Sequence, residues 1–455
     1  MTVYDHPVAA PTRAISARLR RAMALLFATT LVLGAWPAAA QESTGISQRS
    51  IRCHSLANPN KLYSECTTAP FSSAEETLTG SWNGVRDELQ ALGITPTLSY
   101  TTQLLTDPGG QGGQQYAYAG TVALSITWDF GKLFGVSGLS FHISGSQSSG
   151  TNLSADIGNL FTVASAYSGH GLNLDEIYLQ QQGLNQHLTL AIGRLAPANT
   201  FATLPVYGNY VNAGINSYPG SIGANEKPFT SSPVGVEWGA QGLYYVRPDI
   251  QVGVGVYTTN AIAATGGQHG LNFDFQPSNG VLTVGQINYL YNQAANATGM
   301  PGQYSLGAYY DSSKFPSLTG SYSVFDNYGL YAMAQQMVYR PGGPGSQQGL
   351  TLWATVTYAP KQEVNQIPWF LGGGASYQGL LPGRPQDTAS LGVIYGVLSK
   401  CVPNTSAETV LEINYQIALT RWLTFMPDFQ YVFQPSGSSA ITNSAVAGFQ
   451  AVVTF

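Results

Sequence analysis

Alternation of apolar and polar side chains over residues 408–455 constrains this chain more than any other feature of its sequence. The apolar series is Leu411, Ile413, Tyr415, Ile417, Leu419, Phe425, Pro427, Phe429, Tyr431, Phe433, Ala447, Phe449, Ala451, Val453 and Phe455. A period of two residues predicts β-strands with one apolar face and one polar face. The series ends on Phe455, so an open sheet would leave an apolar strand at its edge, where it promotes aggregation. We therefore expect a closed transmembrane barrel, in which the last strand pairs with the first and lipid covers the apolar face.

The composition fits lipid-facing strands better than soluble domains. Charged residues make up 9% of the chain, against roughly 25% in ordinary globular proteins. The mean hydropathy of −0.01 is too low for a helical membrane protein, because Ser, Thr, Asn, Gln and 52 Gly supply polarity without charge. The formal net charge of −5 gives no support for nucleic-acid binding, so we expect no nucleic-acid partner.

The N-terminal segment has the organisation of an export signal. Four arginines precede residue 22, an apolar run follows over residues 22–36, and residues 38–40 are alanines. The run is too short for a comfortable membrane span. We therefore expect a secretory signal peptide over residues 1–40, and the alternative is a membrane anchor.

Between this signal and the first strand, the sequence predicts two short periplasmic parts. Residues 41–77 show no periodicity and are interpreted as an extension. Residues 78–94 are interpreted as a helical segment, in which Ser81 caps a helix that ends at Gly93.

The chain has three cysteines, Cys53, Cys66 and Cys401. An exported protein meets an oxidising compartment, so we predict a Cys53–Cys66 disulfide, with Cys401 left over in an outer loop. A metal site is the weaker interpretation, because the histidines are scattered and no paired cysteine spacing exists. We expect no metal and no other cofactor.

From residue 95 onward the alternation predicts sixteen strands, which together form the barrel domain, residues 95–455. They cover 95–105, 118–130, 139–148, 172–182, 187–195, 233–246, 250–259, 281–291, 304–312, 327–339, 349–359, 368–379, 387–398, 408–419, 423–433 and 445–455. A tilted strand needs ~9–11 residues to cross a bilayer, and bacterial single-chain barrels have even strand numbers.

The gaps between these strands are alternately short and long, as expected for turns at one end of a barrel and loops at the other. The longest are 149–171 and 196–232, and both fall where outer loops are expected; 292–303 is a long exception among the short ones. The alternative, a large soluble solenoid or sandwich, does not predict this alternation.

The same alternation assigns side chains to the inside of the barrel. The predicted inward polar and aromatic positions are Glu237, Gln241, Trp353, Glu412, Asn414, Gln416, Asp428 and Gln430. Carboxylates and amides exchange hydrogen bonds with hydroxyls, and a pyranose face can rest on an aromatic ring. Such a wall suits a neutral polyol, although any water-filled pore is polar, so a general diffusion pore stays open as an alternative.

Nothing in the sequence marks an enzyme. There is no nucleophile elbow, no P-loop and no dinucleotide fingerprint. The adjacent acids Asp175 and Glu176 could form an acid/base pair, but neighbouring strand residues point to opposite faces. The preferred interpretation places one acid in the lumen and the other in a bulge or at the rim.

Several segments from residue 78 to residue 455 resemble motifs of one known protein family. Residues 78–86, LTGSWNGVR, are similar to the opening motif LTGDWGGxR of the carbohydrate-selective porins of the OprB family. Residues 188–201, LTLAIGRLAPANTF, are similar to the family's Gly-Arg/Lys segment that ends in Phe, and residues 175–181, DEIYLQQ, resemble the strand before it. Residues 408–415, ETVLEINY, and 425–432, FMPDFQYV, resemble its last strands.

The resemblance implies a sixteen-stranded barrel that passes mono- and disaccharides such as glucose by facilitated diffusion. It also implies that a long outer loop folds inward and narrows the channel, and residues 196–232 are the candidate, with Tyr207 and Tyr210 lining the pore. Arg194 is the candidate basic group. Strict alternation places Arg194 on the lipid face, so it needs a bulge to turn inward, or else it is a rim arginine.

We accordingly predict an exported protein of the bacterial outer membrane that is not an enzyme. Its expected partners are carbohydrates, outer-membrane lipid and the barrel-assembly machinery, which would recognise the C-terminal Phe455.

Overall fold

The computed structural model describes residues 76–109, 115–232, 234–260, 267–293 and 297–455. The predicted signal peptide and the predicted Cys53–Cys66 disulfide lie outside the described residues and remain predictions. Cys401 is a free thiol and is partly exposed.

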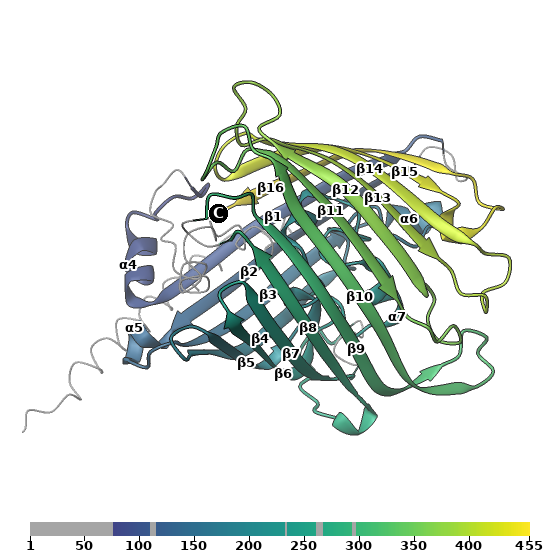
Figure 1. Ribbon diagram of the computed structural model, residues 1–455, viewed down its shortest axis with the longest axis horizontal. Helices are drawn as coiled ribbons and strands as arrows, with labels where there is room; N and C mark the ends of the chain where they lie inside the picture. Colours follow the sequence, from purple (N-terminus) through teal and green to yellow (C-terminus); the bar gives the residue numbers. More distant parts are fainter. Residues whose placement is uncertain (1–75, 110–114, 233, 261–266, 294–296) are drawn as a thin grey trace, which may run out of the picture.

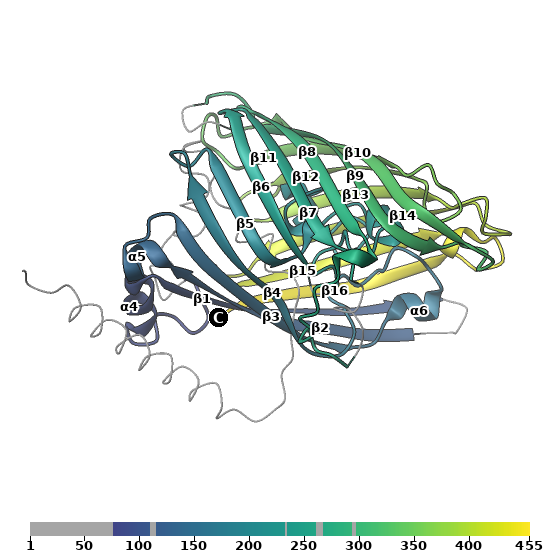
Figure 2. The ribbon, with the colours of Figure 1, turned by 90° about the horizontal axis from the view of Figure 1, so that it is seen from below.

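Sixteen antiparallel strands form one closed barrel (Figures 1 and 2). They are β1 Ile94–Asp107, β2 Gln115–Asp129, β3 Leu139–Gly150, β4 Gly171–Gly183, β5 Leu188–Leu195, β6 Glu237–Arg247, β7 Ile250–Thr258, β8 Val281–Tyr291, β9 Gly302–Pro316, β10 Ser323–Tyr339, β11 Gly349–Tyr358, β12 Trp369–Gln378, β13 Thr388–Val397, β14 Ala407–Ala418, β15 Leu423–Phe433 and β16 Ser444–Thr454. Each pairs with its sequence neighbours, and β1 pairs with β16 through register partners such as Gln103 and Gln450. The prediction of sixteen strands closed by the last one is confirmed.

The helices are short. They are α4 Val85–Leu92, α5 Phe130–Phe134, α6 Leu153–Ile157 and α7 Gly220–Asn225, with single 3₁₀ turns η1 Pro197–Asn199, η2 Pro205–Asn209, η4 Pro277–Asn279 and η5 Pro435–Gly437. Within the described residues, no helix combines the length and the apolar character needed to cross a bilayer.

The strands expose their apolar face outward and cover their polar face. On β14 the outward Ile413 is 48% exposed, whereas its neighbour Glu412 is 1% exposed. On β15 the outward Phe429 is 40% exposed and Gln430 is fully covered. A soluble sheet shows the reverse pattern, so this arrangement requires an apolar solvent around the barrel.

Helix α4 lies at the end of the barrel where β16 ends (Figures 1 and 2), and we call this the α4 end. The helix begins later than predicted, because Trp82 and Asn83 adopt left-handed backbone angles, φ 53° and 57°, and form a turn first. The N-cap is therefore Gly84, and Ser81 serves the turn by accepting a hydrogen bond from Gly84 N. Gly93 ends the helix as predicted, with φ 94°.

At the opposite end, the loop end, two long connections turn into the barrel. We call residues 151–170 the first inward loop and residues 196–232 the second inward loop. Inner-wall side chains hold both: Thr121 donates to Ala166 O of the first loop, and Gln286 and Gln335 accept from the second. Four aromatic side chains of the second loop are fully buried, namely Phe201, Tyr207, Tyr210 and Phe229. The barrel therefore encloses a packed core of its own loops.

Candidate functional site

The inward polar side chains of β14 and β15 share one face, as predicted. Glu412 lies opposite Gln430, and Asn414 lies opposite Asp428. The carboxylate of Glu412 is already in use, because it accepts hydrogen bonds from Val211 N and Asn212 N. The amides donate to both inward loops. Asn414 Nδ2 donates to Asn209 O of the second inward loop, and Gln430 Nε2 donates to Val163 O of the first.

These two strands therefore serve first as a binding surface for the inward loops. Asp428 accepts from the Gln430 amide at 2.8 Å. Gln416 lies on the same inward face and is 3% exposed. Contact between these side chains and a sugar stays a prediction, and it requires access that the loops cover in this structure.

Trp353 of β11 points inward, as predicted, and the second inward loop covers it. The rings of Tyr207 and Tyr210 stand edge-on to the indole, each with centroids 5.5 Å away. Trp353 is 4% exposed, and both tyrosines are fully buried. Burial raises the pKa of each phenol above its ordinary value and keeps both neutral. The three rings form the contact between the loop and the wall, so the indole face is not free for a pyranose.

Glu237 and Gln241 of β6 also face inward, as predicted. Glu237 accepts from Thr258 Oγ1 at 2.9 Å and from Asn260 N at 3.1 Å, and it is 5% exposed. Gln241 bridges Thr200 and Tyr257 and keeps part of its surface open.

Arg194, the predicted basic group of the pore, lies buried in the wall. It pairs with Trp238 of β6 across the ladder, on the same side of β5 as the exposed Ile192. Residues 268–274 lie beside the start of β4, where Leu174 N donates to His269 O. This segment covers the guanidinium of Arg194. Arg194 donates to Gly270 O and stacks on Phe273 with 5.3 Å to the ring centroid. Strict alternation thus holds here, and a covering segment takes the place of the bulge that we expected.

The acid pair Asp175–Glu176 does sit in a bulge. The register between β3 and β4 shifts between Ile143 and Gly145, so two consecutive residues of β4 oppose one residue of β3. Asp175 accepts from Ser146, and Glu176 accepts from Ala196 N at the start of the second inward loop. Both acids therefore bind neighbouring segments of the protein: Asp175 binds β3, and Glu176 binds the start of the second inward loop.

Comparison with known proteins decides the identity of this barrel. The model of the carbohydrate-selective porin family, OprB, matches residues 113–455.

The chain belongs to this family. A curated relative, Porin B of Pseudomonas aeruginosa, is 26% identical over 85% of this chain and 92% of its own length. The putative porin QuiX of Acinetobacter baylyi is 22% identical over 85% of this chain and 94% of its own length. Among solved structures, the high-pH structure of Pseudomonas putida OprB superposes with a TM-score of 0.77 at 24% identity, covering 85% of this chain and all of that one.

This OprB-family protein is therefore a carbohydrate porin of the bacterial outer membrane, a channel rather than an enzyme. In the part of the chain that the structure describes, no three His, Cys, Asp or Glu side chains are grouped so that they could hold a metal ion.

The porin keeps a partly open inner surface on β2, β3 and β4. His142 stacks on Tyr178 with ring centroids 4.7 Å apart, and its ring nitrogens contact Thr127 Oγ1 and Ser140 Oγ. These side chains are partly exposed. Alternation along β3 is enough to place His142 on the inward face, but the Tyr178 stack depends on cross-strand register, which the sequence does not state.

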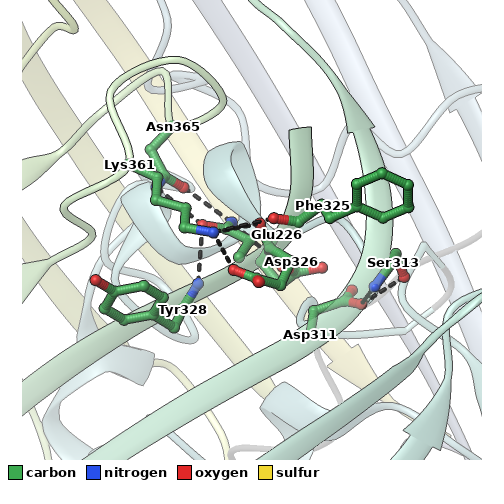
Figure 3. A network of polar contacts seen from close by, with 9 residues as sticks. Glu226, Asp311, Ser313, Phe325, Asp326, Tyr328, Lys361 and Asn365 are labelled. Carbon is green, nitrogen blue, oxygen red and sulfur yellow. Dashed lines mark hydrogen bonds and ion pairs between the residues drawn. The ribbon is translucent and has the colours of Figure 1, made fainter. Parts of the chain in front are cut away.

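A second polar group of the porin ties the second inward loop to β9 and β10 near the loop end (Figure 3). Glu226 lies against the carboxyl group of Asp311 and accepts from Asn327 Nδ2, while Asn327 and Asn365 exchange amide hydrogen bonds of 2.9 Å. Burial raises the pKa of Glu226 well above its ordinary value, and the Asp311 carboxylate raises it further.

Proposed function

We propose that this porin passes small neutral carbohydrates, mono- and disaccharides such as glucose, into the periplasm by facilitated diffusion. The proposal rests on its membership of the carbohydrate-selective family together with a polar inner surface of hydroxyls, amides and stacked rings. Hydroxyl-bearing solutes exchange hydrogen bonds with such groups without leaving a charge unpaired.

We assign the sugar contacts to the partly open inner surface. His142 and Tyr178 offer a flat stacked pair on which a pyranose face can rest, and Thr127 and Gln241 offer hydroxyl and amide groups. The predicted residues Glu237, Trp353, Tyr207, Tyr210, Arg194, Glu412, Asn414, Gln416, Asp428 and Gln430 are assigned to the support of the channel.

The same proposal extends to the surroundings of the barrel. Its outward apolar side chains would face outer-membrane lipid, and Phe455 would be the residue that the barrel-assembly machinery recognises.

Planar-bilayer conductance with increasing glucose or maltose tests the function. We expect the single-channel conductance to fall in a saturable way. A fall that only follows bulk viscosity, matched with dextran, would show a general diffusion pore instead. Tyr178→Leu should weaken the block, whereas the outward Tyr310→Leu should leave it unchanged.

A further inference from the structure

One strand, β14, holds both inward loops through two carboxylates on the same face. Glu412 accepts from Val211 N at 2.6 Å with one oxygen and from Asn212 N at 3.0 Å with the other. Its side chain is 1% exposed. The carboxylate thus accepts hydrogen bonds from two consecutive backbone N–H groups of the second inward loop.

Glu408, four residues earlier on the same face, does the same for the first inward loop. It accepts from Leu160 N at 2.8 Å, from Phe161 N at 2.9 Å and from Ser436 N at 2.6 Å. It is fully buried. Hydrogen bonds to a carboxylate are shorter and stronger than those to a neutral acceptor.

At four other positions of the wall, one side chain accepts one backbone N–H from these loops. Glu176 accepts from Ala196, Gln103 from Ala166, Gln286 from Ala202 and Gln335 from Val206. Glu408 and Glu412 of β14 each accept at least two, so they bind the most backbone N–H groups among these contacts.

The two loops are also joined to each other beside these carboxylates. Ala213 N donates to Thr162 O at 2.8 Å, and Ser165 N donates to Val211 O at 3.1 Å. The Asn212 side chain donates to both Phe161 O and Gln430 Oε1. Because they share these bonds, movement of one loop strains the other.

We propose that Glu408 and Glu412 are the positioning residues of the channel. They attach both inward loops to β14 as one unit, and this attachment sets the width of the channel. They act through the loop backbone and make no contact with the solute. The inference rests on the porin function and adds the residues that fix its selectivity.

Two substitutions of Glu412 separate positioning from charge. Glu412→Gln keeps the length but replaces one acceptor with an amide N–H₂, which cannot accept from Val211 N or Asn212 N. Glu412→Asp keeps the charge but shortens the side chain, so it cannot reach both N–H groups. Glu363→Gln is the control, because it removes the same charge from an exposed side chain in the β11–β12 connection at the loop end.

Single-channel recordings of the full-length porin in planar bilayers measure the effect. We expect both Glu412 variants to raise the open-channel conductance at least twofold, with rapid flicker, and to weaken glucose block several-fold, while Glu363→Gln matches the wild type. Glu408→Asp should give the same phenotype, since the loops form one unit. Conductance and flicker do not require sugar, so they test the positioning role even if sugar block is absent from the wild type.

A wild-type conductance for Glu412→Asp, with a change in ion selectivity for Glu412→Gln alone, would overturn the proposal and make Glu412 a charge that lines the pore. Heat-modifiable migration on gels reports barrel assembly for each variant. If Glu412→Gln does not assemble, Glu412→Asp and Glu408→Asp decide the outcome, because both keep the charge that balances the buried N–H groups.

Discussion

The indole of Trp353 on β11 donates a hydrogen bond of 2.6 Å to the phenol oxygen of Tyr210 in the second inward loop. Tyr210 in turn donates to Leu391 O of β13 at 2.9 Å. One loop side chain thus connects two strands from inside the barrel.

Substitution of Trp353 should therefore weaken the attachment of the second inward loop, and a smaller replacement side chain should weaken it more. Trp353→Phe removes one hydrogen bond and should lower the free energy of unfolding by about 0.5–1.5 kcal/mol. Trp353→Ala also leaves a cavity against the two tyrosines and should cost about 3–5 kcal/mol. Denaturant unfolding in detergent measures both. Trp369→Phe is the control, because Trp369 is 45% exposed on the outside; an equal loss there would refute a special role for Trp353.

The buried Glu226 makes stability depend on pH. Burial, together with the Asp311 carboxylate, raises the pKa of Glu226 well above its ordinary value in the folded state. The folded state therefore favours the protonated acid, so its contribution is complete below the unfolded pKa and is lost as the pH rises through the folded pKa. The slope is at most about 1.4 kcal/mol per pH unit for one group.

Glu226→Gln should flatten this dependence. The amide is neutral at every pH, can still accept from Asn327 and can donate to Asp311. Unfolding curves from pH 4 to pH 9 should show the variant more stable than the wild type on the alkaline side. Glu363→Gln, at an exposed position, should keep the wild-type slope, and an unchanged slope in Glu226→Gln would assign the pH dependence to other groups.

Arg86 joins the N-terminal turn to the closing strand. Its guanidinium donates to Phe455 O at 2.6 Å, to Thr77 Oγ1 at 2.5 Å and to Gly80 O at 3.1 Å. It also lies 4.4 Å from the Trp82 ring centroid. These contacts explain why the opening motif carries Arg86 and Trp82 together.

Arg86→Lys should not preserve these contacts, because an ammonium lacks the planar fork that reaches several acceptors at once. We expect a loss of about 1.5–3 kcal/mol in the free energy of unfolding. The matched control is Arg421→Lys, since Arg421 is 65% exposed in a surface pair with Glu76, and such pairs contribute about 0–1 kcal/mol. Equal effects of the two substitutions would contradict this role of Arg86.

The two faces of β14 and β15 should respond differently to polar changes. Ile413 is 48% exposed on the outside, where Lys costs up to about 2–4 kcal/mol at the bilayer midplane. Ile413→Lys should therefore impair insertion into lipid vesicles. Asp428→Asn should assemble normally, because an amide oxygen can still accept from Gln430. Exchanged phenotypes would mean that the strands are inside out.

Alternation along the sequence predicted all sixteen strands and the inward or outward direction of side chains such as Glu412 and Ile413. The reason is local: a strand's backbone sends neighbouring side chains to opposite sides regardless of what lies there. The outward position of Ile413 and the inward position of Glu412 both follow from that geometry. Arg194 also follows strict alternation and lies on the same side of β5 as the outward Ile192, although we predicted it as a basic group of the pore.

Only the tertiary structure decided which groups each face of the barrel wall contacts. Glu412 binds Val211 N across 201 residues of sequence, and Arg194 binds Gly270 O across 76 residues. These contacts form only when the barrel closes and its loops fold inward, so no local pattern encodes them. The sequence therefore determined a polar inner wall, whereas folding decided that much of this wall binds the protein's own loops, because buried N–H and carboxylate groups must find partners wherever the closed barrel brings them together.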